Sequence, residues 1–328
     1  MNMLKTYRIP RTDLDVSNIG YGCMTIGGSW KSSSPLTVED RSKATRAVMT
    51  AYESGITLFD HADIYTAGKS ESVFGEILNE HPGMREKIIL QSKCGIRMAD
   101  TPRPGDPFRY DFSRDHILNS VEGSLQRLQT DHLDILLLHR PDPLVEPEDV
   151  AAAFAKLYAD GKVRYFGVSN HTAAQIELLQ QAIDYPLVIN QVELNLLHSS
   201  LIEEGALANT EGARFTASSG ILDYCRLHRI MVQAWSPVAK GTLVHPPEHA
   251  EERIRNTASL VAKLAAEKKT SKEAILLGWL LRHPADIQPI IGTTNPDRIS
   301  ASVQANTIEL TREEWYTLLS TIRGKHLP

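Results

Sequence analysis

Three apolar stretches of the sequence each end in an ionisable residue, and the three residues differ in chemistry. Asp60 ends the first stretch, Lys93 the second and His139 the third. A further ionisable side chain, Tyr65, follows shortly after Asp60. Burying such groups unpaired costs several kcal/mol, so packing alone does not explain them. One lysine or histidine alone is usually a local salt bridge or a satisfied core group, but the three together favour one shared site.

A phenol, an ammonium group and an imidazole in one dry site suit proton transfer to a carbonyl oxygen. We expect Lys93 to pair with Asp60 and to lower the pKa of the Tyr65 phenol from about 10. The phenol then becomes a better proton donor near neutral pH. With the imidazole of His139 beside it, such a group can protonate the alkoxide that develops on a carbonyl.

Two other groups of residues point to a nucleotide. Ser169, Asn170 and Gln191 lie at the end of, or within, apolar runs, where their polar groups could hydrogen-bond a carboxamide. Trp235, followed by Ser236, places a flat ring at a strand end, where it could stack on a heterocycle. Core packing explains a lone tryptophan nearly as well.

A candidate phosphate site follows the last apolar strand. Gly292, Thr293 and Thr294 lead into a helix that Asn295 should cap, and Arg298 lies one turn further on. Hydroxyls, free backbone amides and an arginine at a helix N-terminus favour an anion, and barrel folds often bind phosphate in this position.

These residues need a framework that brings strand ends together. Apolar strands alternate with helices eight times, without a linker or a shift in composition. This alternation predicts a parallel sheet covered by helices, and eight units favour a closed (β/α)8 TIM barrel over an open doubly wound sheet. The open-sheet dinucleotide signature is incomplete, because Thr25 stands at the third glycine position after Gly20 and Gly22. In a barrel the strand ends share one face, which carries the chemistry.

We expect a single barrel domain over residues 1–328, with three additions. A β-hairpin occupies residues 1–17, an inserted loop with one short helix occupies residues 199–220, and a C-terminal helix and tail occupy residues 311–328. A long loop that contains proline and glycine covers residues 96–112.

The composition excludes several classes of partner. Hydrophobic residues make up 42% of the chain, charged residues 23%, and the net charge is −5 without a dense Lys/Arg run, which disfavours nucleic acid and anionic membranes. No apolar run reaches transmembrane length, and the N-terminus has no signal core. Three cysteines without paired spacing fit a reducing compartment. We expect a cytoplasmic protein, with a monomer favoured.

Taken together and in this order, the motifs resemble those of the aldo-keto reductases, in particular bacterial members, over essentially the whole chain. The matching stretches are Phe59-Asp60…Tyr65, Ser92-Lys93, Leu136-Leu137-Leu138-His139, Gly167-Val168-Ser169-Asn170, Asn190-Gln191-Val192-Glu193, Trp235-Ser236-Pro237 and Gly292-Thr293-Thr294-Asn295…Arg298.

The resemblance implies hydride transfer from NADPH to an aldehyde or ketone without a metal. Tyr65 would be the general acid, Lys93 and Asp60 would tune it, and His139 would orient the carbonyl. The cofactor residues implied are, for the nicotinamide, Ser169, Asn170, Gln191 and Trp235 and, for the ribose phosphate, Thr293, Thr294 and Arg298.

The phosphate turn bears on the choice between NADPH and NADH. Many family members carry a lysine where this chain has Gly292, but Arg298 can still meet a ribose phosphate with a charge-assisted hydrogen bond. An NAD site would place a carboxylate against the ribose hydroxyls. The one carboxylate expected nearby, Asp297, should face away, so we expect NADPH to bind more tightly.

Two other functions remain open on sequence grounds. A barrel metallohydrolase could use His61, Asp63 and His139 as ligands, although such enzymes usually take more histidines from several strands. A cofactor-bound sensing or partner-binding subunit with little turnover would share the fold. Apart from the metal-site alternative, five histidines show no grouping with other chemistry-bearing residues and are expected at the surface or at helix caps. They are His61, His116, His132, His171 and His198.

Overall fold

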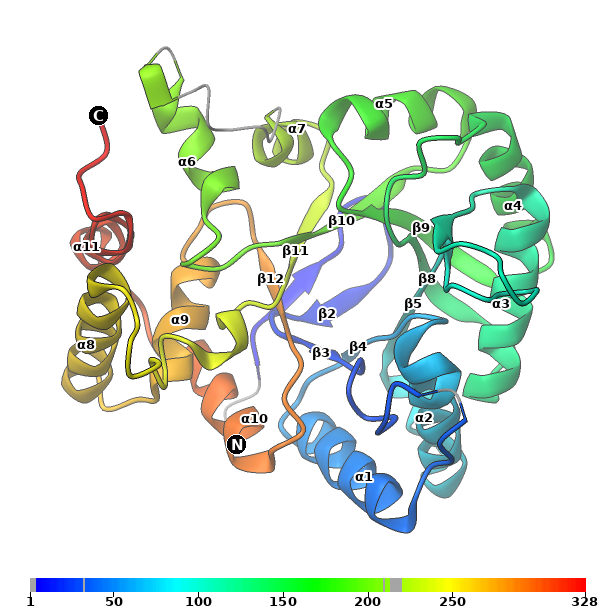
Figure 1. Ribbon diagram of the computed structural model, residues 1–328, viewed down its shortest axis with the longest axis horizontal. Coiled ribbons are helices and arrows are strands. Elements are labelled where there is room, and N and C mark those ends of the chain that lie inside the picture. The colour runs from blue at the N-terminus through cyan, green and yellow to red at the C-terminus, as the bar shows by residue number, and fades with distance from the viewer. Residues whose placement is uncertain (1–3, 32, 209, 213–219) are drawn as a thin grey trace.

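A closed barrel of eight parallel strands forms the centre of the computed structural model, which describes residues 4–31, 33–208, 210–212 and 220–328 (Figure 1). Each strand pairs in parallel with the next around the barrel. This confirms the predicted (β/α)8 barrel. In barrel order the strands are β3 (Gly20–Gly22), β4 (Leu58–Asp60), β5 (Ile89–Cys94), β8 (Leu133–Leu138), β9 (Val163–Ser169), β10 (Leu187–Glu193), β11 (Met231–Trp235) and β12 (Gln288–Ile291).

Helices surround the barrel (Figure 1). Their starts follow signals in the sequence: Thr37 and Thr172 form capping boxes, and the Ser113 side chain accepts a hydrogen bond from the first turn of its helix. The described helices are α1 (Val38–Glu53), α2 (Lys69–Glu80), α3 (Arg114–Leu128), α4 (Pro147–Ala159), α5 (Ala173–Ala182), α6 (Ser200–Leu207), α7 (Ile221–Leu227), α8 (Glu252–Glu267), α9 (Lys272–Leu281), α10 (Pro296–Val303) and α11 (Arg312–Arg323).

An N-terminal hairpin closes the amino end of the barrel. Its strands, β1 (Thr6–Arg8) and β2 (Asp15–Ser17), pair antiparallel. Ile9 and Leu14 from the hairpin are buried in the same apolar cluster as side chains from inside the barrel, such as Leu137. With that end filled, a ligand can enter only from the carboxyl ends of the strands.

The barrel closes where β3 pairs with β12. A side chain at Gly20 would come within 2.6 Å of Ile290 Cδ1, and one at Gly22 within 3.1 Å of Ile290 Cγ2. The two glycines therefore serve close strand packing at this seam. This explains why they resemble the start of a dinucleotide signature without being one.

Two regions differ in detail from the sequence-based expectation. The long loop over 96–112 contains a short antiparallel hairpin, β6 (Ile96–Arg97) and β7 (Arg109–Tyr110). Two-residue strands are too short to leave a periodic signal, so the sequence could not show them. In the 199–220 insert the structure shows α6, while residues 209 and 213–219 lie outside the described part of the chain.

The C-terminal addition lies on the outside of the barrel. Helix α11 contacts α8, and Trp315 of α11 stacks on Trp279 of α9 with ring centroids 5.1 Å apart. In the part of the chain that the structure describes, no helix is both long and apolar enough to cross a membrane.

Candidate active site

The side chains at the ends of β4 and β5 meet in a buried hydrogen-bonded group. Lys93 Nζ donates to Asp60 Oδ1 and Oδ2, both at 2.7 Å, to the carbonyl of His61 at 2.9 Å and to the Tyr65 hydroxyl at 3.0 Å. The Lys93 side chain is fully buried and that of Asp60 is 4% exposed. An ammonium group that contacts both a carboxylate and a phenol is the arrangement expected from the sequence.

The pairing of the two strands produces this contact. Asp60 is the last residue of β4 and stands in register with Gln91 of β5, two positions before Lys93. Gln91 also donates to Asp60 Oδ1, at 2.6 Å. Tyr65 follows on a loop and begins a tight 3-10 turn, η1 (Tyr65–Gly68).

A buried ionic cluster supports the turn that carries Tyr65. Glu71, fully buried in α2, accepts hydrogen bonds from Arg127 Nε at 2.8 Å and from the hydroxyl of Ser92 at 2.6 Å. Ser92 directly precedes Lys93 in β5. Gly68 has a φ of +82°, and a Cβ there would lie 2.9 Å from Arg127 Cδ. The cluster thus links the turn to the strand that carries the lysine.

The charges of the site differ from expectation in one respect. Burial alone lowers the pKa of Lys93, but Asp60 and Tyr65 outweigh burial, so this pKa is raised and the ammonium stays charged. The pKa of Tyr65 is also raised, chiefly by burial, although Lys93 pulls it down. The expected fall in the phenol pKa was therefore wrong: desolvation and the nearby Asp60 carboxylate exceed the effect of the lysine. The phenol stays protonated, which is the form that donates.

His139 lies beside the phenol as a neutral base. Its ring meets the Tyr65 ring edge to face, with centroids 5.8 Å apart. Burial, and then the positive charges of Lys93 and Arg140, hold the pKa of His139 well below its usual value. A neutral imidazole can hydrogen-bond a carbonyl group without carrying charge.

These residues line one end of a cavity of about 630 Å³ at the carboxyl ends of the strands. Nearly all the residues singled out in the sequence line it. Those that do are Asp60, Tyr65, His139, Ser169, Asn170, Gln191, Trp235, Ser236, Gly292, Thr293 and Arg298. Lys93 is buried behind Asp60, and Thr294 is not among the lining residues.

The amide residues and the tryptophan form one connected network. Trp235 Nε1 donates to Asn170 Oδ1 at 3.0 Å, and Asn170 Nδ2 donates to the Ser169 hydroxyl at 2.8 Å. That hydroxyl in turn donates to the Gln191 carbonyl at 2.8 Å. The network fixes the orientation of the Trp235 ring, so the ring can offer a flat surface without further ordering.

The other end of the cavity is formed by the start of α10. Asn295 caps this helix, as expected, and its side chain accepts from the backbone amides of Asp297 at 2.8 Å and Arg298 at 3.4 Å. The expectation of free amides in this first turn was wrong, because the cap already binds them. Ser302 of α10 and Glu273 of α9 also line this cavity. Glu273 therefore brings a carboxylate to this cavity, whereas Asp297 was the one carboxylate expected nearby. No pattern in the sequence marks Glu273, because it lies on a separate helix far from any motif.

Further lining residues missed in the sequence come from loops and helices beyond the motifs and include Met24, Arg140, Lys240 and Val244. Of these, Arg140 directly follows His139, and that adjacency is the one signal that could have identified it.

Several histidine predictions were wrong. His61, His116 and His171 are buried, at 0%, 9% and 2% exposure, because the loops and helices that carry them pack inward. The His61 ring meets Phe74 edge to face at 4.5 Å, and burial followed by the Lys93 charge lowers its pKa to about 3. The prediction is confirmed for His198, which is exposed.

The residues considered as metal ligands are not gathered together. His139 lines the cavity, but neither His61 nor Asp63 is among the lining residues. Within residues 4–31, 33–208, 210–212 and 220–328, no group of three or more His, Cys, Asp or Glu is arranged to hold a metal ion.

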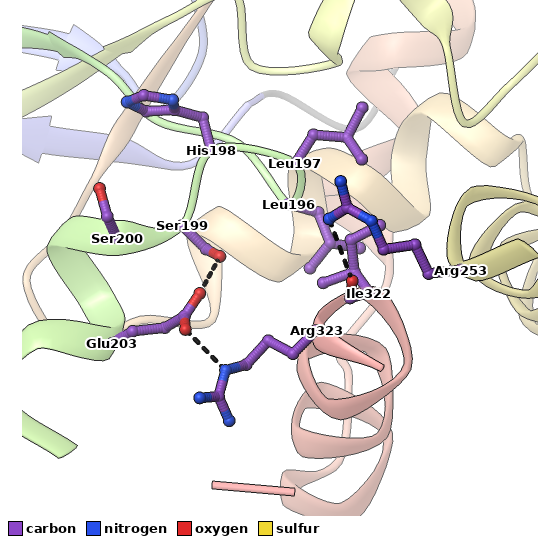
Figure 2. Close-up of a pocket in the computed structure, with 9 residues that line it drawn as sticks. All are labelled: Leu196, Leu197, His198, Ser199, Ser200, Glu203, Arg253, Ile322 and Arg323. Atoms are coloured by element: carbon purple, nitrogen blue, oxygen red, sulfur yellow. Dashed lines mark hydrogen bonds and ion pairs between the residues drawn. The ribbon is translucent and has the colours of Figure 1, made fainter. Parts of the chain in front are cut away.

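A second cavity of about 230 Å³ lies between the start of α6 and the C-terminal end of α11 (Figure 2). The Ser199 hydroxyl donates to Glu203 Oε1, and Glu203 Oε2 accepts from Arg323 Nε at 2.6 Å. Arg253 of α8 reaches the carbonyl of Ile322. These contacts attach the insert helix to the C-terminal helix.

The chain matches known proteins along almost all of its length. A family model described as the Aldo/keto reductase family matches residues 18–322. An uncharacterized oxidoreductase of Bacillus subtilis, YcsN, is 38% identical over 84% of this chain and 87% of its own. A 6-dehydroglucose reductase of Agrobacterium fabrum is 36% identical over 98% of this chain and 99% of its own. The solved structure of a glycerol dehydrogenase from Gluconobacter oxydans superposes with a TM-score of 0.82, at 25% identity, over 97% of this chain and 95% of that one.

Proposed function

Because the chain belongs to the aldo/keto reductase family, we propose that it reduces an aldehyde or ketone with NADPH and that Tyr65 donates the proton. One observation carries the assignment of roles. At the end of the large cavity, Lys93 Nζ is hydrogen-bonded to Asp60 and to the Tyr65 hydroxyl. A protonated phenol with a permanent cation at 3.0 Å is a proton donor whose anion, once formed, is stabilised.

Each side chain has a distinct part in the proposed reaction. The carbonyl oxygen lies against the Tyr65 hydroxyl and the neutral imidazole of His139, and both can hydrogen-bond it. As negative charge develops on that oxygen, the phenol transfers its proton. Lys93 then faces the phenolate, while Asp60 keeps the buried ammonium compensated and correctly placed.

The cavity residues fit a nicotinamide dinucleotide, which supplies the hydride. The network of Ser169, Asn170 and Gln191 offers hydrogen-bonding groups for a carboxamide near the reacting end. The ring of Trp235, already held by Asn170, offers a stacking face. At the other end, Arg298 offers positive charge and Thr293 a hydroxyl for the ribose phosphate, beside the positive end of the α10 dipole.

Replacing Tyr65 with phenylalanine tests the proposed role of the phenol. Tyr65→Phe should lower carbonyl reduction by about two to four decades, the usual contribution of a general acid. NADPH binding should persist, because the ring and its packing remain. A panel of aldehydes and ketones, followed by NADPH absorbance, measures the rate, and a fluorescence titration measures binding.

Tyr52→Phe is the matched control, since Tyr52 lies on α1 outside the cavity. It should behave as wild type. If Tyr65→Phe also turned over at the wild-type rate, the phenol would not be the proton donor.

A further inference from the structure

Arg140 brings an uncompensated positive charge into the active-site cavity. It lines the cavity together with Tyr65 and His139. Among the described residues its guanidinium meets an aromatic ring and no acidic partner. Some arginines elsewhere in the fold, such as Arg127, are paired with carboxylates. A cation without a counter-ion inside a partly enclosed cavity is available to a ligand.

The guanidinium is also held in place before any ligand arrives. Its Cζ lies 5.6 Å from the centroid of the Trp235 ring, and Asn170 fixes that ring through a 3.0 Å hydrogen bond. An arginine resting on a fixed aromatic ring loses little further freedom when it binds an anion.

Arg140 is close to the reacting groups. It directly follows His139 at the end of β8, and its charge contributes to the lowered pKa of that imidazole. The carboxylates lining the cavity do not compete for it at this end: Asp60 is paired with Lys93. Glu273 of α9 lines the same cavity and is not paired with Arg140. An anion at Arg140 therefore lies in the same cavity as the Tyr65 hydroxyl.

We propose that the substrate is an oxo acid, an aldehyde or ketone that carries a carboxylate, and that Arg140 binds this carboxylate. The inference rests on the proposed reductase function and adds the substrate class. The planar fork of an arginine matches the two oxygens of a carboxylate. With the carboxylate on Arg140, the carbonyl at the other end of the molecule reaches Tyr65 and His139.

Matched pairs of substrates test the substrate class. Succinic semialdehyde and butanal have the same chain length, and 4-carboxybenzaldehyde and 4-methylbenzaldehyde share a ring, but only one member of each pair is charged. For wild type, kcat/KM should be higher for the acid in each pair. In Arg140→Met, the acid should lose about 10-fold to 100-fold more kcat/KM than its neutral partner, mainly through KM, since a charged hydrogen bond is lost.

Two further variants separate this role from a structural one. Arg140→Lys keeps the charge without the fork and should recover part of the preference for the acid. Arg46→Met removes an exposed arginine from α1 and should keep the wild-type ratio between acid and neutral substrate. The Kd for NADPH, measured by fluorescence, should be the same in Arg140→Met as in wild type.

Each other outcome overturns the proposal in a recognisable way. Equal losses of kcat/KM on acid and neutral substrates in Arg140→Met, or no preference for the acids in wild type, would show that Arg140 does not bind a carboxylate. A weaker Kd for NADPH in Arg140→Met would assign the arginine to a cofactor phosphate. If wild type reduced none of the four aldehydes with NADPH, or if Tyr65→Phe were fully active, the proposed function itself would fail.

Discussion

At the scale of single residues, the sequence predicted where side chains at the strand ends lie, but not the surroundings of side chains in the loops. Asp60, Lys93 and His139 could be placed together because strand alternation and the parallel barrel determine where such side chains point. The buried position of His61 could not be foreseen, because no periodicity governs a loop. The direction of the Tyr65 pKa was missed for a different reason: it depends on the depth of burial, which only the folded structure shows.

The preference for NADPH over NADH is argued at this scale too. Arg298 is expected to favour NADPH by about 2–3 kcal/mol, the scale of a charged hydrogen bond. Arg298→Ala should weaken NADPH strongly and NADH little. Glu273→Gln should shift the ratio of the two affinities in the opposite direction, because a negative charge leaves the same cavity wall. Titrating both cofactors into wild type and each of the two variants by tryptophan fluorescence measures the six dissociation constants. An equal loss of affinity for both cofactors in Arg298→Ala would mean that the arginine supports the fold and does not bind the ribose phosphate.

At the scale of elements, the helices were predicted well because capping residues mark where they begin. Asn295 accepts hydrogen bonds from the first turn of the helix that it was predicted to cap, and Thr37, Ser113 and Thr172 accept them in the same way at the starts of α1, α3 and α5. The turn after Tyr65 carries no comparable signal, since its geometry depends on Arg127, which contacts it from a distant helix.

A glycine substitution tests how far this turn positions the phenol. Gly68 and Gly83 have nearly the same positive φ, +82° and +84°, but only Gly68 has neighbours within 4 Å of an added Cβ. Alanine at either position should cost about 1–2 kcal/mol from backbone strain. Gly68→Ala should cost about 1–3 kcal/mol more, because the methyl group displaces Arg127. It should also lower kcat, whereas Gly83→Ala should not. Chemical unfolding and steady-state kinetics measure both effects, and equal behaviour of the two variants would contradict a positioning role for the turn.

At the scale of the whole molecule, stability should depend on pH through groups buried beside the site. Burial, and then the charge of Glu71, raise the pKa of Asp63 to about 7 from 3.8. The folded state therefore binds a proton that the unfolded state has lost, and stability falls as pH rises from about 4 to about 7. His61, with its pKa lowered to about 3 from 6.5, acts in the opposite sense: its contribution grows as pH rises from about 3 to 6.5.

Replacing Asp63 isolates its share of this dependence. Relative to wild type, Asp63→Asn should gain stability as pH rises from 4 to 7, by at most about 4 kcal/mol, and change no further above that. Asp115→Asn, at an exposed position on α3, is the control and should show a nearly constant difference. Urea unfolding at a series of pH values gives the curves. A difference for Asp63→Asn that did not vary with pH would mean that the carboxyl group titrates normally.

The seam of the barrel has a consequence for how the chain folds. Gly20 pairs with Ile290, so the first barrel strand meets the last across almost the full length of the sequence. Contacts between such distant residues form slowly, because the entropy of closing a long loop must be overcome first. The large cavity is lined from both sides of this seam, by Gly22 and by Ile290 and Ile291. The binding site therefore does not exist until the last strand has docked, and a cofactor that binds there draws the folding equilibrium toward the closed barrel by mass action.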